Sequence, residues 1–157
     1  MHRALVITAV AAVAMLAPAC GEKDEETTAT SPSRLTKAVF VREANRICKR
    51  EFDKVERAAK QFFADAPAGK EAPPSELEEF GSKTVYPALQ SVIDRIRALG
   101  APSGEEAQVN EYLDAFQSGL DELKQDPQQI AQGGAAPAFE KSDKLAGELG
   151  LDDCVRV

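Results

Sequence analysis

The chemistry open to this chain is best approached through its three cysteines, Cys20, Cys48 and Cys154. A thiol can accept a lipid, form a disulfide or bind a metal, and the surrounding residues decide between these. Before Cys20 lie a basic start with Arg3 and an uncharged run of 16 residues, Ala4 to Ala19. As a helix this run would reach only ~24 Å, short of the ~30 Å hydrocarbon core of a membrane. The run is therefore typical of a cleaved signal segment.

Cys20 is predicted to be the lipidated first residue of a mature lipoprotein. The small residues Ala17 and Ala19 suit a signal peptidase, and a polar, charged stretch follows Gly21. Ala17-Pro18-Ala19 also satisfies the ordinary secretory peptidase, which would release a soluble protein, and an uncleaved N-terminal anchor is a third alternative. We favour lipidation because a cysteine at the first mature position has no purpose in ordinary secretion. Membrane lipid, through several acyl chains such as palmitate, would then hold the protein on the extracytoplasmic face of the cell membrane.

Cys48 and Cys154 form an even remainder, which predicts one disulfide in an oxidising compartment. The bond would close a long loop and contribute ~4–5 kcal/mol at most through the unfolded chain. A redox-active or metal-binding thiol pair is the alternative, and no Cys-x-x-Cys spacing supports it.

Absent residue types exclude most other chemistry. The one histidine (His2) and both methionines (Met1, Met15) precede Cys20, and tryptophan is missing. This excludes from the mature chain the histidine-based triads, His-ligated zinc, haem with His or Met ligands, and Glu-x-x-His di-iron sites, so we predict no catalytic residue, no metal and no cofactor. An enzyme that uses only carboxylates, lysine and tyrosine would need two acids ~5–10 Å apart in a cleft. The net charge of −7 argues against a nucleic-acid partner.

Four helical segments must position these groups. Residues 1–19 are assigned to the signal, 20–35 to the lipidated cysteine and a polar tether, and 36–157 to one helical domain. The first helix is predicted from a Thr36 N-cap, with Leu35 and Phe40 as a hydrophobic staple, to residues 64–66. Its apolar stripe includes Cys48.

The other three segments carry similar punctuation. The second is predicted to begin with a capping box at Ser75 and to kink near 83–86 because of Pro87. The third is predicted to begin with a box at Ser103. The fourth opens at 126–129, is split by Gly133-Gly134 and Pro137, and its later part, 138–149, is capped by Gly150.

These segments predict an all-α, up-down-up-down four-helix bundle with a kinked second helix, a split fourth helix and one disulfide. In that topology the last helix lies antiparallel beside the first. The tail after Gly150 can then return to the first helix and bring Cys154 to Cys48.

Charge is distributed unevenly along the chain. Residues 34–60 hold nine basic and four acidic side chains, a net charge of +5, whereas residues 61–157 carry −10. The simplest interpretation is that a basic helix pairs with acidic neighbours. The alternatives are a face for anionic partners, such as lipid headgroups or wall polymers, and a solvated face without a role.

Two end motifs, Ala44-Asn45-Arg46-Ile47-Cys48 and Leu149 to Cys154, carry a resemblance, together with Leu99-Gly100-Ala101-Pro102 between them. The frame resembles a family of small, uncharacterised actinobacterial lipoproteins. The resemblance implies compartment, helical fold and disulfide, but no activity.

Asn45 within this frame is expected to bond the tail backbone or face solvent, with ligand contact as the less favoured alternative. For the whole chain we predict a membrane-anchored, non-catalytic module that binds an envelope protein or a small ligand. A passive spacer and a soluble secreted helical protein are the alternatives.

Overall fold

The computed structural model describes residues 35–64 and 72–156. Cys20, the signal segment and most of the tether lie outside the described residues, so their predicted roles stay predictions. Within the described residues every regular element is a helix, and no strand occurs. The predicted all-α class is confirmed.

The first helix, α1, runs over Lys37–Ala64. The hydroxyl of Thr36 accepts a hydrogen bond from the Val39 N–H at 3.4 Å, which confirms the predicted N-cap. Phe40, Ala44, Ile47 and Cys48 are buried along one side of the helix. The prediction that Cys48 faces the core is also confirmed.

The second predicted helix is built from three pieces: α2 (Pro74–Phe80), a π-helical turn η1 (Gly81–Val85) and α3 (Tyr86–Leu99). Pro87 lacks the N–H that a regular helix needs. Just before it the chain forms a π-helical turn, in which the Tyr86 N–H donates to the Gly81 carbonyl. The irregularity lies at the predicted place. The predicted capping box at Ser75 is wrong, because the helix begins one residue earlier at Pro74, whose fixed φ suits the first helical position.

The helix α4 (Glu106–Gln125) also begins without its predicted box. Gly104 turns with φ +86°, which displaces Ser103 from the helix start. The Glu106 carboxylate accepts a hydrogen bond from the Gly104 N–H at 2.7 Å instead.

The fourth segment is divided, as predicted. It consists of the 3-10 helix η2 (Pro127–Ala135), the short turn η3 (Pro137–Phe139) and the helix α5 (Glu140–Leu149). Gly133 has φ +59°, which breaks the helical path. Gly150 ends α5 in the left-handed conformation, and a short turn, η4 (Asp152–Cys154), follows.

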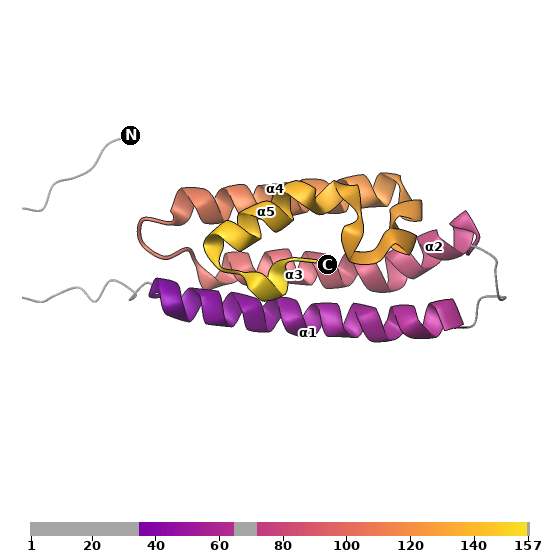
Figure 1. The fold of residues 1–157 in the computed structure, drawn as a ribbon, viewed down its shortest axis with the longest axis horizontal. Helices are drawn as coiled ribbons and strands as arrows, with labels where there is room; N and C mark the ends of the chain where they lie inside the picture. The colour runs from indigo at the N-terminus through magenta and orange to yellow at the C-terminus, as the bar shows by residue number, and fades with distance from the viewer. Residues whose placement is uncertain (1–34, 65–71, 157) are drawn as a thin grey trace, which may run out of the picture. The chain divides into compact units, whose positions relative to one another are not determined.

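The helices pack as a bundle in which α1 contacts α3, α3 contacts α4, and α4 contacts α5 (Figure 1). The predicted packing of the last helix beside the first is wrong. α5 packs chiefly on α4, and the turn η4 meets α1 in its place. With 10 residues, α5 is ~15 Å long, whereas the 28 residues of α1 extend over ~42 Å.

One core joins all of these elements. The described residues, 35–64 and 72–156, belong to one compact unit, and every long helix buries large apolar side chains in it. The described unit therefore holds a complete core and the disulfide. None of its helices combines the length and the apolar character that crossing a membrane would require.

Candidate functional site

The tail after α5 is fixed to α1 by a covalent bond and by one asparagine. Cys48 and Cys154 form the predicted disulfide, with their Cα atoms 5.0 Å apart and both residues fully buried. The Asn45 amide donates to the Gly150 carbonyl at 3.1 Å, and its oxygen accepts from the Asp153 N–H at 3.0 Å. This confirms the expected bond to the tail backbone and commits both ends of the Asn45 amide to it.

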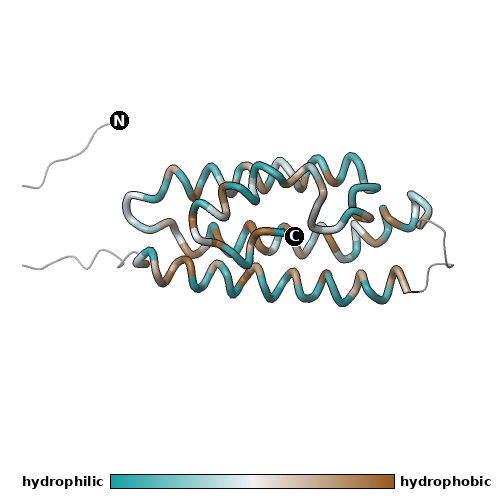
Figure 2. Tube along the Cα trace, in the orientation of Figure 1, coloured by the Kyte–Doolittle hydropathy of each residue, from teal (hydrophilic) through white to brown (hydrophobic). Residues whose placement is uncertain are grey.

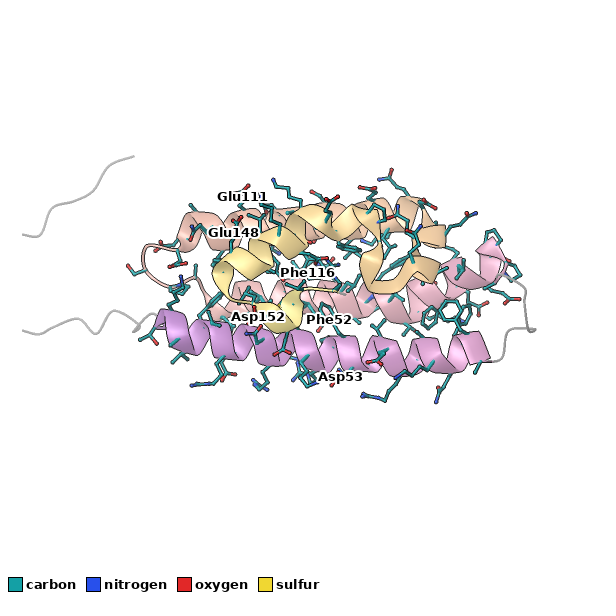
Figure 3. The ribbon with its side chains drawn as sticks, in the orientation of Figure 1. Phe52, Asp53, Glu111, Phe116, Glu148 and Asp152 are labelled. Carbon is teal, nitrogen blue, oxygen red and sulfur yellow. A yellow bond between two sulfur atoms is a disulfide. The ribbon has the colours of Figure 1, made fainter. Side chains whose placement is uncertain are left out.

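A second attachment of the tail lies around Arg156, which the sequence reasoning did not identify. Its guanidinium donates to the Asp143 carboxylate at 2.6 Å and to the Ser142 hydroxyl at 2.9 Å. The same group stacks over the ring of Phe139 at 3.5 Å and lies 4.6 Å from the centre of the Phe116 ring. Phe116 lies in the interior of the bundle in Figure 3.

Burial governs the electrostatics of this cluster. Desolvation lowers the pKa of Arg156 and raises that of Asp143, although each charge favours the ionised form of the other. The ion pair therefore positions the tail more than it stabilises the fold. Tyr112, 1% exposed, lies in the same region, and its hydroxyl has no hydrogen-bond partner among the described residues.

An apolar groove of about 400 Å³ runs between the second half of α1 and the η2–tail side of the bundle. One wall is the α1 stripe of Phe52, Val55, Ala59 and Phe63. In Figure 3, Phe52 lies on the edge of α1 that faces the rest of the bundle. The floor and the opposite wall are also mostly apolar; they include Phe80, Val85, Leu89, Leu123, Ile130 and Phe139.

The groove exists because the fourth segment does not continue as one helix. Gly133 and Pro137 interrupt it, so α5 begins only at Glu140 and covers the bundle away from the second half of α1. In a regular bundle the side chains of a continuous fourth helix would fill this space. Here the 3-10 helix η2 and the short turn η3 occupy that part of the chain instead. The sequence carried this signal in the Gly-Gly and Pro breaks.

The rim of the groove carries the few polar groups that touch it. Asp53 and Glu56 lie on the α1 side, and Gln129 and Arg156 lie opposite. Gln129 is not free to bind, because its side-chain oxygen accepts the Ala138 N–H at 3.3 Å. Lys49 lies 3.4 Å from Asp53, and Lys60 pairs with Glu56.

The larger hollow, about 940 Å³, is an open depression between α4 and the η3–α5 segment. Small and charged side chains line it, among them Ala107, Glu111, Asp114 and Lys144. Glu111 lies at the outer side of α4 in Figure 3. No aromatic or large aliphatic side chain among the described residues lines this depression, so it is the weaker candidate.

The buried carboxylate of Glu51 is held by three cations. It accepts hydrogen bonds from Arg50 at 3.0 Å, Lys54 at 2.8 Å and Arg95 at 3.2 Å. Burial alone would raise the pKa of Glu51. The hydrogen bonds and charges of Lys54 and Arg50 together outweigh this effect, so the pKa of Glu51 lies below its ordinary value. The carboxylate is therefore ionised and structural.

Tyr86 lies at the irregular part of the second helical segment. Its hydroxyl donates a hydrogen bond to the Glu78 carboxylate at 3.3 Å. Desolvation, with the nearby Glu78 charge, raises the pKa of Tyr86 to about 12. Across the described residues, no cluster of three or more metal-binding side chains occurs.

Comparisons with known proteins add no identification: no family model, curated protein or solved structure matches the chain.

Proposed function

We propose that this protein is a membrane-anchored extracytoplasmic lipoprotein whose helical domain is a non-catalytic binding module. Its ligand would be an amphiphile with a single acyl chain, held in the groove between α1 and η2. The observation that carries the proposal is this groove, a hollow of about 400 Å³ lined mainly by aliphatic and aromatic side chains. Small-molecule sites typically enclose ~300–1,000 Å³ and have such linings.

The dimensions of the groove favour an acyl chain. The wall from Phe52 to Phe63 covers 11 helical steps, or ~16 Å. One leaflet of a bilayer, half of a ~30 Å hydrocarbon core, has about the same thickness. A single acyl chain can therefore lie along the wall while its polar end remains at the rim.

The anchor is proposed from the sequence. Cys20 follows a signal-like run, and pairing of the other two cysteines leaves it as the one cysteine without a structural partner. Such an anchor would place the groove close to a supply of acyl chains.

The binding proposal is tested on residues 21–157, which hold the whole described core and lack Cys20. Fluorescently labelled palmitate is titrated into this chain and into two variants. Ala59→Phe fills the groove, and Ala107→Phe adds the same side chain to the open depression. We expect at least a ~10-fold loss of affinity for the first variant, since a bulky side chain in a filled pocket changes binding by 1–3 kcal/mol, and no change for the second.

Absence of palmitate binding, or equal binding by both variants, would refute the groove as the site and favour the passive spacer. Circular dichroism of each variant checks that the fold is retained. Intact-mass measurement of the native protein tests the anchor separately, because acylation adds the mass of the lipid at Cys20. An unmodified mature chain starting at Cys20 would favour the soluble secreted alternative.

A further inference from the structure

The outward face of α1 carries a row of cations. Exposed basic side chains recur along the helix at Lys37, Arg42, Arg46, Lys49, Lys54, Arg57 and Lys60. Figure 2 shows the hydrophilic residues of α1 mainly along its outer edge, with apolar residues turned to the bundle. From Arg42 to Lys60 the row is ~27 Å long.

The ion pairs of these cations do not explain the row. Across to another element, Lys37 reaches Glu105 at 2.8 Å. Most of the other ion pairs are formed with acids of α1 itself, namely Glu43, Glu51, Asp53 and Glu56. The prediction that the basic helix pairs with acidic neighbouring helices is therefore wrong for most of its length.

The local acids do not cancel the row. Within α1, eight basic side chains stand against four acids, and Arg57 forms no ion pair with any described residue. The acids that face outward with the row are Glu43, Asp53 and Glu56, whereas Glu51 is buried. The helix thus keeps a net charge of +4 while the rest of the domain is acidic.

We propose that this face of α1 docks on an anionic phospholipid surface and lays the groove against the membrane. Charge complementarity identifies the partner. Anionic headgroups attract every Lys and Arg side chain near the bilayer surface, and each added side chain strengthens the attraction by a comparable amount. The acidic helices α4 and α5 lie behind α1 and α3 in the bundle, and charges beyond a Debye length of ~10 Å are largely screened. The domain can therefore bind through α1 despite its negative total charge.

The far end of α1 fits the same arrangement. Phe63, with 39% of its surface exposed, is the one large hydrophobic side chain that is exposed among the described residues, and it also lines the groove. A helix with cations on one face and aromatic residues at its border suits the membrane interface. With α1 on the surface, the groove opens beside the acyl region from which its proposed ligand would come.

This inference rests on the proposed anchor for its setting. The 14 residues from Gly21 to Arg34 can extend to at most ~48 Å, which is enough to let α1 lie flat beside the anchored Cys20. The docking can be tested on a chain that lacks the lipid anchor at Cys20. The docking proposal and the anchor proposal can therefore fail separately.

The test measures flotation of residues 21–157 with vesicles of phosphatidylcholine, with and without phosphatidylglycerol. We expect binding only to the anionic vesicles, lost between about 0.01 M and 1 M salt as the Debye length falls from ~30 Å to ~3 Å. The variant Arg42→Gln/Arg46→Gln/Arg57→Gln, whose residues lie outside the groove lining, should bind about 100-fold more weakly.

A matched control removes the same charge from the acidic side. Lys124, Lys141 and Lys144 are exposed and paired with acids of α4 and α5, so Lys124→Gln/Lys141→Gln/Lys144→Gln should bind vesicles as the unmodified chain does. Equal weakening of both triple variants, or equal capture by neutral vesicles, would overturn the proposal. Capture by a soluble polyanion as tight as by vesicles would also overturn it, in favour of a wall polymer.

Palmitate binding separates the two proposals. The α1 charge variant should bind labelled palmitate normally, and Ala59→Phe should float normally with anionic vesicles. A chain that floats as expected but binds no palmitate retains the docking face and loses the proposed ligand.

Discussion

Reduction of the Cys48–Cys154 bond should lower the stability of the domain without unfolding it. In residues 21–157 these two are the only cysteines, so reductant acts on one bond. The sequence separation is 106 residues, and the chain-entropy model gives ~4.7 kcal/mol for a loop of about this length. Domains of this size unfold with ~5–15 kcal/mol, so the loss is a third of the stability or more.

The folded state should survive because the tail has other attachments. Asn45 holds the backbone on both sides of η4, and Arg156 holds the end of the tail to Asp143. The effect of reduction therefore falls mainly on the unfolded chain, which becomes less compact. We expect the urea midpoint to fall and the m-value to rise, since m follows the surface exposed on unfolding.

Equilibrium urea denaturation with and without reductant, followed by circular dichroism, measures both quantities. Unfolding free energies within ~1 kcal/mol of each other would refute the reasoning, because the loop-closure effect is several times larger. The variant Cys48→Ala/Cys154→Ala repeats the measurement without reductant and should give a similar loss. Unfolding of the reduced chain in the absence of urea would show instead that Asn45 and Arg156 do not hold the tail.

Three further outcomes follow from the packing. Gly119→Ala should destabilise by about 1–3 kcal/mol, because its Cβ would lie 2.5 Å from the Ala138 carbonyl oxygen, whereas Gly147→Ala, with open space around it, should raise the thermal midpoint. Asn45→Ala should cost about 1–3 kcal/mol in urea denaturation and speed hydrogen exchange at the Asp153 amide. Glu51 has a lowered pKa when folded, so its stabilisation is present above the unfolded pKa and disappears as pH falls through the folded pKa. Glu51→Gln should therefore have a lower free energy of unfolding at neutral pH, and this free energy should fall less steeply as the pH is lowered. An unchanged fall of the unfolding free energy at acidic pH would contradict this.

The helical positions were predictable because their signals are local. Thr36 caps α1, Pro87 follows the irregular turn, and Gly150 ends α5 in the left-handed conformation. Each of these residues constrains its own backbone, whatever the rest of the chain does. The disulfide was predictable for a different reason, since the count of cysteines left two to pair.

The capping boxes failed because other local residues competed with them. Pro74 already supplies the fixed φ that begins α2, and Gly104 adopts a positive φ that displaces Ser103 from the start of α4. Propensity for a cap describes one residue, whereas the helix start depends on the neighbours on both sides. Packing was harder still: Gly119 has no side chain, so Phe139 of η3 can approach α4 closely, and the helix α5 that follows also packs on α4.

The same displacement of α5 gives the two halves of α1 different surroundings. Around Cys48 the helix is closed by the tail, through a covalent bond and the Asn45 contacts. From Phe52 onward the apolar stripe continues, but a groove replaces the fourth helix. A stripe of this kind predicts burial without saying which element buries it. Because the tail also forms one wall of the groove through Arg156, the attachments that stabilise the first half of α1 fix the shape of the groove beside the second.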